Sequence, residues 1–119
     1  MRILAFNIAH DSSVCSINKG HIEFFCKEER LSRIKRDKHP FKSLQLYKSK
    51  NFGKIDHILY CTPSNYGGES EFYYREYIKK IFDMEMHNFS SLTHHLCHAS
   101  SAFYNSGFKK ALTFVIDRN

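Results

Sequence analysis

The stretch RILAFNIAHDSSVCSINKGHIEFFCK, residues 2–27, decides the fold of this chain. It contains three short apolar runs, at residues 2–7, 14–17 and 21–27, separated by polar turns at 10–13 and 18–20. The second turn, Asn18-Lys19-Gly20, is a tight-turn signal, because glycine readily adopts the positive φ that hairpin turns require. The stretch therefore predicts an antiparallel three-stranded meander that begins a sheet.

The rest of the chain alternates helical and strand patterns. We expect a helical turn or two at 28–35, a helix after Pro40 that ends before Asn51, and a strand at 57–61. A loop at 62–68 leads to a helix at 69–82 and a short strand at 84–89. A helix at 92–104 and a strand at 111–117 complete the expected elements. This order, βββαβα(β)αβ, predicts an α/β fold whose mixed sheet is led by the meander and continues through crossover helices.

Two of the expected helices carry further detail. The helix at 69–82 has an apolar stripe that we interpret as a core face, formed by Phe72, Tyr73, Tyr77, Ile81 and Phe82. The helix at 92–104 has Ser91 or Thr93 as its candidate N-cap.

The bulk composition is typical of one globular domain. The 119 residues are 42% hydrophobic and 25% charged, and no apolar run approaches the ~20 residues that span a bilayer. The first apolar run is too short for a secretion signal, and the four cysteines form no Cys-x-x-Cys pair. We therefore expect a cytoplasmic chain with free thiols. The net charge of +6 fits either an anionic partner or a lysine-rich solvated surface.

Two histidines on the last expected helix carry the sharpest chemical signal. His94 and His98 are four residues apart, so they share one helical face and can bind one metal ion. Asp117, at the end of the expected last strand, adds a carboxylate, and two histidines with one carboxylate suit iron or zinc. His95 points about 100° away from His94 and is not expected to bind the same ion. Helices also carry such pairs by chance, so spacing alone leaves both interpretations open.

Two further segments carry candidate binding groups. The turn His10-Asp11-Ser12-Ser13 offers hydroxyls and backbone N–H groups to phosphate oxygens and an imidazole for proton transfer; the alternative is a turn that only closes the hairpin. The side chains of Arg30, Arg33 and Lys35 suit recognition of a phosphate or carboxylate; the alternative is a solvated amphipathic turn.

Taken together, these segments resemble the N-terminal part of the O-carbamoyltransferases, which include the nodulation-factor and antibiotic-tailoring carbamoyltransferases. The resemblance rests on five runs in the same order, ILAFNIAHDSS (3–13), KG (19–20), EERLSRIK (28–35), HHLCHASSAFY (94–104) and VID (115–117). It implies a partial ribonuclease-H-like lobe of the actin-like ATPase superfamily. Residues 1–119 would then form the N-terminal part of the N-terminal domain of a longer protein.

In such enzymes a C-terminal domain makes carbamoyl-adenylate from carbamoyl phosphate and ATP, and the N-terminal domain transfers the carbamoyl group to an acceptor hydroxyl. The resemblance therefore implies a small-molecule acceptor, with the adenylate-forming part supplied by a missing C-terminal region or a partner chain. It implies neither a membrane nor a nucleic acid as partner.

The resemblance also implies roles by position. His94, His98 and Asp117 would bind a divalent metal, iron ahead of zinc, and His10 would take the acceptor proton. Substrate or nucleotide binding would fall to the turn and the basic segment, namely Asp11, Ser12, Ser13, Arg30, Arg33 and Lys35. One departure is Arg118, which stands where the family has a glycine.

Two other functions stay open. A tRNA threonylcarbamoyl-adenosine-type modifying protein shares the His-x-x-x-His pair, but the HDSS turn and the EERLSR run argue against it. A basic, non-catalytic interaction module would fit the charge of +6 and would bind nucleic acid or a partner chain.

Overall fold

The predicted meander forms the first half of the sheet in a computed structural model, which describes residues 1–63, 68–84 and 88–117. β1 (Arg2–Asn7) pairs antiparallel with β2 (Ser13–Asn18), and β2 pairs antiparallel with β3 (His21–Lys27). Between β2 and β3, Lys19 and Gly20 have φ values of 50° and 83°, the positive φ pair of a type I′ hairpin. The meander prediction is confirmed.

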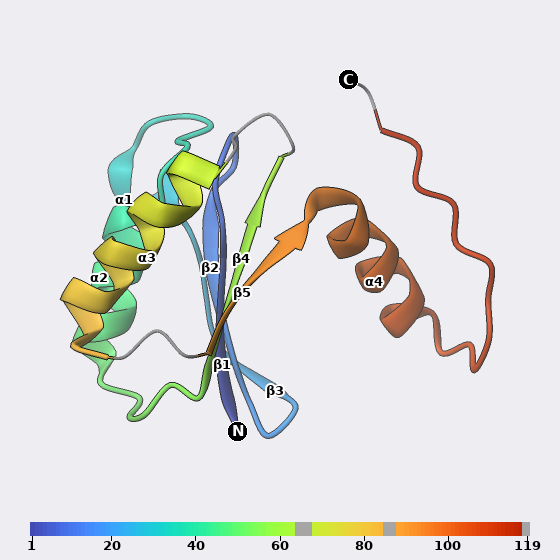
Figure 1. The fold of residues 1–119 in the computed structure, drawn as a ribbon, viewed down its shortest axis with the longest axis horizontal. Coiled ribbons are helices and arrows are strands. Elements are labelled where there is room, and N and C mark those ends of the chain that lie inside the picture. Colours follow the sequence, from blue (N-terminus) through green and yellow to red (C-terminus); the bar gives the residue numbers. More distant parts are fainter. Residues whose placement is uncertain (64–67, 85–87, 118–119) are drawn as a thin grey trace.

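Two parallel strands extend the sheet on the other side of β1. β4 (His57–Thr62) runs parallel to β1, and β5 (Phe89–Thr93) runs parallel to β4. The strand order is therefore β3-β2-β1-β4-β5, and the described residues form an α/β fold with a five-stranded mixed sheet and four helices (Figure 1).

Three helices, α1 (Glu28–Ser32), α2 (Phe41–Lys50) and α3 (Gly68–Phe82), cover one face of the sheet (Figure 1). The core lies between them and that face, and its fully buried residues include Leu4, Val14, Leu44, Ile58, Tyr60 and Ile78. The fourth helix, α4 (His94–Ser106), follows β5, leaves the sheet on the other side, and has no buried residue. No helix in the described ranges is long and apolar enough to cross a membrane.

The expected core stripe of α3 is partly wrong. Phe72 and Tyr73 are 68% and 54% exposed, whereas Tyr74 and Ile78 are buried in their place. The predicted residues Tyr77, Ile81 and Phe82 are partly buried against the core. The observed stripe has i, i+3, i+4 and i+7 spacing from residue 74, which is one continuous helical face; Phe72 and Tyr73 fall to the side of it.

The C-terminal elements also differ from the expected ones. The strand placed at 84–89 instead begins at Phe89 and continues through Leu92 and Thr93, so α4 begins at His94. Thr93 is its N-cap, with Oγ1 accepting from the Leu96 N–H at 3.3 Å. Residues 111–117 form no strand, because this segment extends past α4, away from any strand that could pair with it (Figure 1). Three parts of the expectations lie outside the described residues. They are most of the loop at 62–68, the middle of the strand at 84–89, and Arg118.

Candidate metal site

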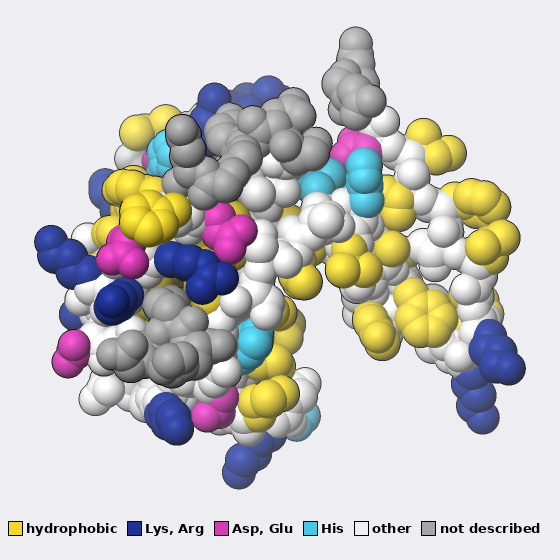
Figure 2. Space-filling model, in the orientation of Figure 1, with side chains coloured by type: hydrophobic (Ala, Val, Ile, Leu, Met, Phe, Trp, Pro, Cys, Tyr) yellow, Lys and Arg dark blue, Asp and Glu magenta, His cyan; other side chains and the backbone are white. Residues whose placement is uncertain are grey.

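The candidate metal ligands lie at the carboxyl edge of the parallel strands. β1, β4 and β5 run in one direction, so their carboxyl ends meet at one edge of the sheet, which is where α/β folds bind ligands. α4 begins directly at that edge, and Thr93 caps it, so His94 is the first helical residue after β5. Figure 2 shows histidine and acidic side chains gathered at this end of α4.

Three side chains converge there. His94 Nε2 lies 2.7 Å from Asp117 Oδ2 and 3.0 Å from His98 Nε2, and His98 Nε2 lies 4.0 Å from the same carboxylate oxygen. Ligand atoms bound at about 2.0–2.2 Å to one ion are separated by about 3–4 Å. Two of the three separations fall in that range, and the His94–Asp117 distance of 2.7 Å is that of a hydrogen bond. The group can therefore hold a metal ion, as the spacing of the two histidines and the aspartate predicts. The group does not include His95.

The site is open to solvent. The side chains of His94, His98 and Asp117 are 35%, 56% and 38% exposed. Three protein ligands leave coordination positions free, which is the pattern of catalytic rather than structural metal sites. The His94 and His98 rings are edge to face, with centroids 4.4 Å apart, and their Nε2 atoms approach each other at 3.0 Å.

The turn that holds His10 begins at the same edge of the sheet, three residues after the end of β1. Its backbone is strained, since Ala9 and Asp11 have φ values of 80° and 63°. Two hydrogen bonds to the segment before α2 hold it, from the Ala9 N–H to Lys38 O at 3.2 Å and from the Ser12 N–H to Asp37 O at 3.1 Å. The turn is therefore held in one shape by a segment distant in sequence.

His10 is exposed and is oriented by the aspartate beside it. Its Nδ1 lies 3.3 Å from Asp11 Oδ2, and Lys27 Nζ lies 3.1 Å from Asp11 Oδ1. The hydrogen bond from Lys27, with a smaller contribution from His10, lowers the pKa of Asp11 and keeps this carboxylate ionised. The exposed imidazole can therefore exchange protons with a ligand at the edge of the sheet.

The two serines of the turn are engaged within the protein. Ser12 is 1% exposed, and its hydroxyl donates to Asp37 O at 2.9 Å. Ser13 donates from its N–H at 2.9 Å and from its hydroxyl at 2.7 Å to the Asn7 side-chain oxygen. Both hydroxyls thus stabilise the turn in this structure instead of pointing to solvent.

The basic residues of the Glu28–Lys35 run are exposed. Arg30 lies on α1, while Arg33 and Lys35 follow it, with Arg33 as the left-handed C-cap of α1 at φ 62°. They are exposed on and after α1, whose first residue Glu28 donates its backbone N–H to Ser12 O of the His10 turn at 2.9 Å, and they are not part of the three-residue ligand group.

Sequence reasoning missed two residues that hold the turn, Asn7 and Lys27. Lys27 lies directly opposite Ser13 in the β2–β3 pairing, so the predicted register of the meander could have placed it beside the turn. Asn7 is the last residue of β1. A polar residue at the end of an apolar strand could have indicated that its side chain binds the following turn.

No protein-family model matches the chain, and no curated protein matches it.

Proposed function

We propose that this chain is the N-terminal part of a metal-dependent carbamoyltransferase, with its sheet as part of a ribonuclease-H-like lobe. The observation that carries the proposal is the convergence of His94, His98 and Asp117 at the sheet edge where the His10 turn also begins. The same residues carry the resemblance of the sequence to O-carbamoyltransferases. The meander-led mixed sheet with crossover helices supports the fold part of the proposal.

The donor set fits the metal that the family implies. Two imidazole nitrogens and one carboxylate oxygen suit iron(II) or zinc with open positions, and the three side chains lie close enough together that the group could hold one ion. A bound metal supplies Lewis-acid polarisation of a carbonyl or phosphate oxygen.

The residues of the chain would act around that centre. Carbamoyl-adenylate, made from carbamoyl phosphate and ATP by a further domain or partner, presents an activated carbonyl to an acceptor hydroxyl. His10 removes the hydroxyl proton as the oxygen attacks, and Asp11 holds the imidazole in place. Arg30, Arg33 and Lys35 stabilise the departing phosphate of AMP by charge, whereas Ser12 and Ser13 fix the shape of the turn.

Metal analysis after anaerobic loading with iron(II), and separately with zinc, tests the site. We expect one metal per chain and a loss of affinity of more than about tenfold in His94→Ala and in His98→Ala. His95→Ala is the matched control, because it removes a neighbouring helical imidazole outside the ligand group. A wild-type chain that binds no metal, or a His95→Ala variant that loses as much affinity, would contradict the site. Steeply salt-dependent binding of single-stranded nucleic acid by a metal-free chain would instead favour the basic interaction module.

The transfer step is tested by AMP release from carbamoyl-adenylate in the presence of excess small polyhydroxyl acceptors. His10→Ala should lower the rate by about a hundredfold, the typical contribution of a general base. His21→Ala, which removes an exposed imidazole from β3, should leave the rate unchanged. Equal rates in wild type and His10→Ala would exclude His10 from the reaction.

A further inference from the structure

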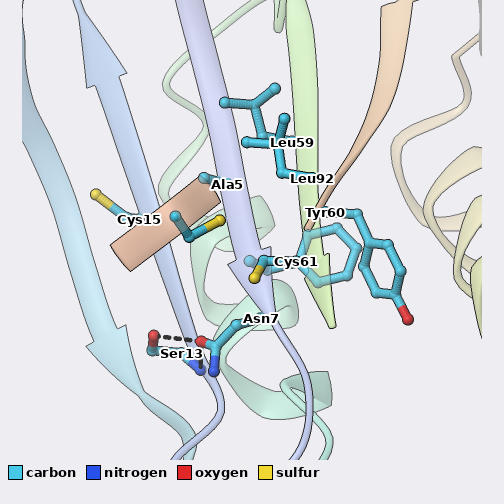
Figure 3. A pocket seen from close by; sticks show the side chains of 10 residues that line it. Ala5, Asn7, Ser13, Cys15, Leu59, Tyr60, Cys61 and Leu92 are labelled. Carbon is cyan, nitrogen blue, oxygen red and sulfur yellow. Dashed lines mark hydrogen bonds between the residues drawn. The ribbon is translucent and has the colours of Figure 1, made fainter. Parts of the chain in front are cut away.

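A small pocket of about 180 Å³ lies on the sheet face that α1, α2 and α3 leave uncovered. Side chains from β1, β2, β4, β5 and α4 line it, and three of them are cysteines, Cys15, Cys61 and Cys97. Figure 3 shows Cys15 of β2 and Cys61 of β4 at this pocket, on the two strands that flank β1. All three thiols are free and half-buried. The proposed function uses none of them.

Two of these thiols are direct neighbours. Cys61 is near the end of β4 and pairs with Leu92 of β5. α4 starts two residues after Leu92, and its first turn brings Cys97 back over the end of β4 into the pocket. Burial, together with interaction with the adjacent Cys97 thiol, raises the pKa of Cys61 to about 12. Cys15 lines the same pocket, and burial raises the pKa of its thiol.

We propose that Cys61 and Cys97 form a reversible disulfide that ties α4 to the carboxyl end of β4. The oxidant is a small-molecule disulfide such as oxidised glutathione. One cysteine thiolate attacks a sulfur of that disulfide, a mixed disulfide forms, and the first small thiol leaves with the proton. The second cysteine then attacks the protein sulfur of the mixed disulfide and releases the second small thiol. Two cysteine thiols thereby lose two electrons and two protons, and the small disulfide gains them.

The position of the bond gives it a structural consequence. His94 lies three residues before Cys97 and His98 directly after it, so the disulfide would fix the helical turn that carries both imidazoles. A cross-link between distant segments also restricts the unfolded chain and so stabilises the folded one. The proposal does not depend on a bound metal and is tested on metal-free protein.

Peptide mapping under non-reducing conditions, after incubation with oxidised glutathione, tests the bond. We expect the chain to lose two hydrogen masses and to give one linked peptide pair containing Cys61 and Cys97, which dithiothreitol separates. Cys15→Ser and Cys26→Ser should keep the linked pair, and Cys97→Ser should lose it. Stable glutathione adducts on both cysteines, or a bond from Cys61 to Cys15, would overturn the proposal.

A second measurement needs no substitution, so it does not depend on how a variant folds. Hydrogen exchange is compared between oxidised and reduced wild-type chain. The amides in the first turns of α4 should exchange at least about tenfold more slowly in the oxidised form. Equal exchange in the two forms would show that the bond does not tie α4 to the sheet.

Discussion

At the scale of single residues, Glu28 joins three segments that are far apart in the sequence. It is 2% exposed, and its carboxylate accepts the backbone N–H groups of Lys42 and Ser43 at 2.9 and 2.8 Å, in the first turn of α2. Its own N–H donates to Ser12 O at 2.9 Å. A negative charge at a helix N-terminus is favourable, so this buried carboxylate replaces the side-chain cap that Pro40 cannot supply.

We therefore expect Glu28→Ala to lower the free energy of unfolding by about 2–3 kcal/mol, since it removes two hydrogen bonds to a charged group and leaves two N–H donors buried. Glu29→Ala is the control, because the partly exposed Glu29 carboxylate contacts Lys27 Nζ and the backbone N–H of Arg36 at the surface. This substitution should cost less than about 1 kcal/mol. Urea unfolding measures both values. Similar losses in the two variants would contradict the capping role.

A second residue-scale contact makes stability depend on pH. Arg2 donates to both carboxylate oxygens of Glu23, at 2.6 and 3.2 Å, and Ser16 donates to the same carboxylate at 2.8 Å. The hydrogen bond from Arg2 lowers the pKa of Glu23 below its ordinary value of 4.5. The unfolded state binds a proton on Glu23 more readily than the folded state does. The ion pair therefore contributes its full stabilisation of the fold above the ordinary pKa of 4.5, and this stabilisation is lost as the pH falls through the lowered pKa of the folded state.

Glu23→Gln should accordingly be about 1 kcal/mol less stable than wild type at neutral pH. The difference should shrink as the solution is acidified below the ordinary pKa of the carboxyl group, because the wild-type side chain then becomes neutral as well. Thermal unfolding of both proteins over a series of acidic buffers measures this. A difference that does not change with pH would show that the charge of Glu23 is not what stabilises the contact.

At the scale of elements, α3 shows how packing selects one face of an aromatic helix. Tyr74 is 2% exposed and lies against Phe6 and Tyr60, with ring centroids 5.5 and 5.6 Å apart. Its hydroxyl lies 2.7 Å from His39 Nδ1. Phe72, two residues away, is 68% exposed. Both are aromatic residues in one helix, so composition alone does not separate them.

Tyr74→Ala should destabilise the chain by about 3–5 kcal/mol, as for other large aromatic residues removed from a core. Phe72→Ala should change stability by no more than about 0.5 kcal/mol. The pair is measured by urea unfolding of each variant beside wild type. A large loss in Phe72→Ala would mean that this side of α3 is covered by another part of the protein.

At the scale of the whole molecule, the parallel strands bring the His10 turn and the His94 group to one edge of the sheet. The segment after α4 leads to Asp117, whose carboxylate contacts His94. Within that segment Leu112, Phe114 and Ile116 are 81%, 78% and 95% exposed. Its sequence has the β-branched and aromatic residues of a strand, yet none of the described residues forms a strand beside it that could supply backbone hydrogen bonds.

Hydrogen exchange should therefore separate residues 111–117 from β4. The amides of 111–117 should exchange at nearly the rate of an unfolded chain. The amides of β4, which is paired on both sides, should exchange only through openings whose free energy approaches that of global unfolding. Mass spectrometry of peptides from the two segments measures this. Equal protection would show that residues 111–117 are paired as a strand in solution.

The sequence by itself determined the features that depend on neighbouring residues. Alternating apolar runs and the Asn18-Lys19-Gly20 turn specify the meander, and the i, i+4 spacing of His94 and His98 specifies a shared helical face, because periodicity within one element is local. Tertiary structure alone decided the contacts between distant segments. Asp117 reaches His94 although residues 111–117 form no strand, and Tyr74 rather than Phe72 enters the core. Glu28 caps α2, and Cys61 and Cys97 line one pocket. The choice of Tyr74 depends on which surfaces exclude water together. The other contacts depend on which distant segments the fold brings side by side, and no single segment contains that information.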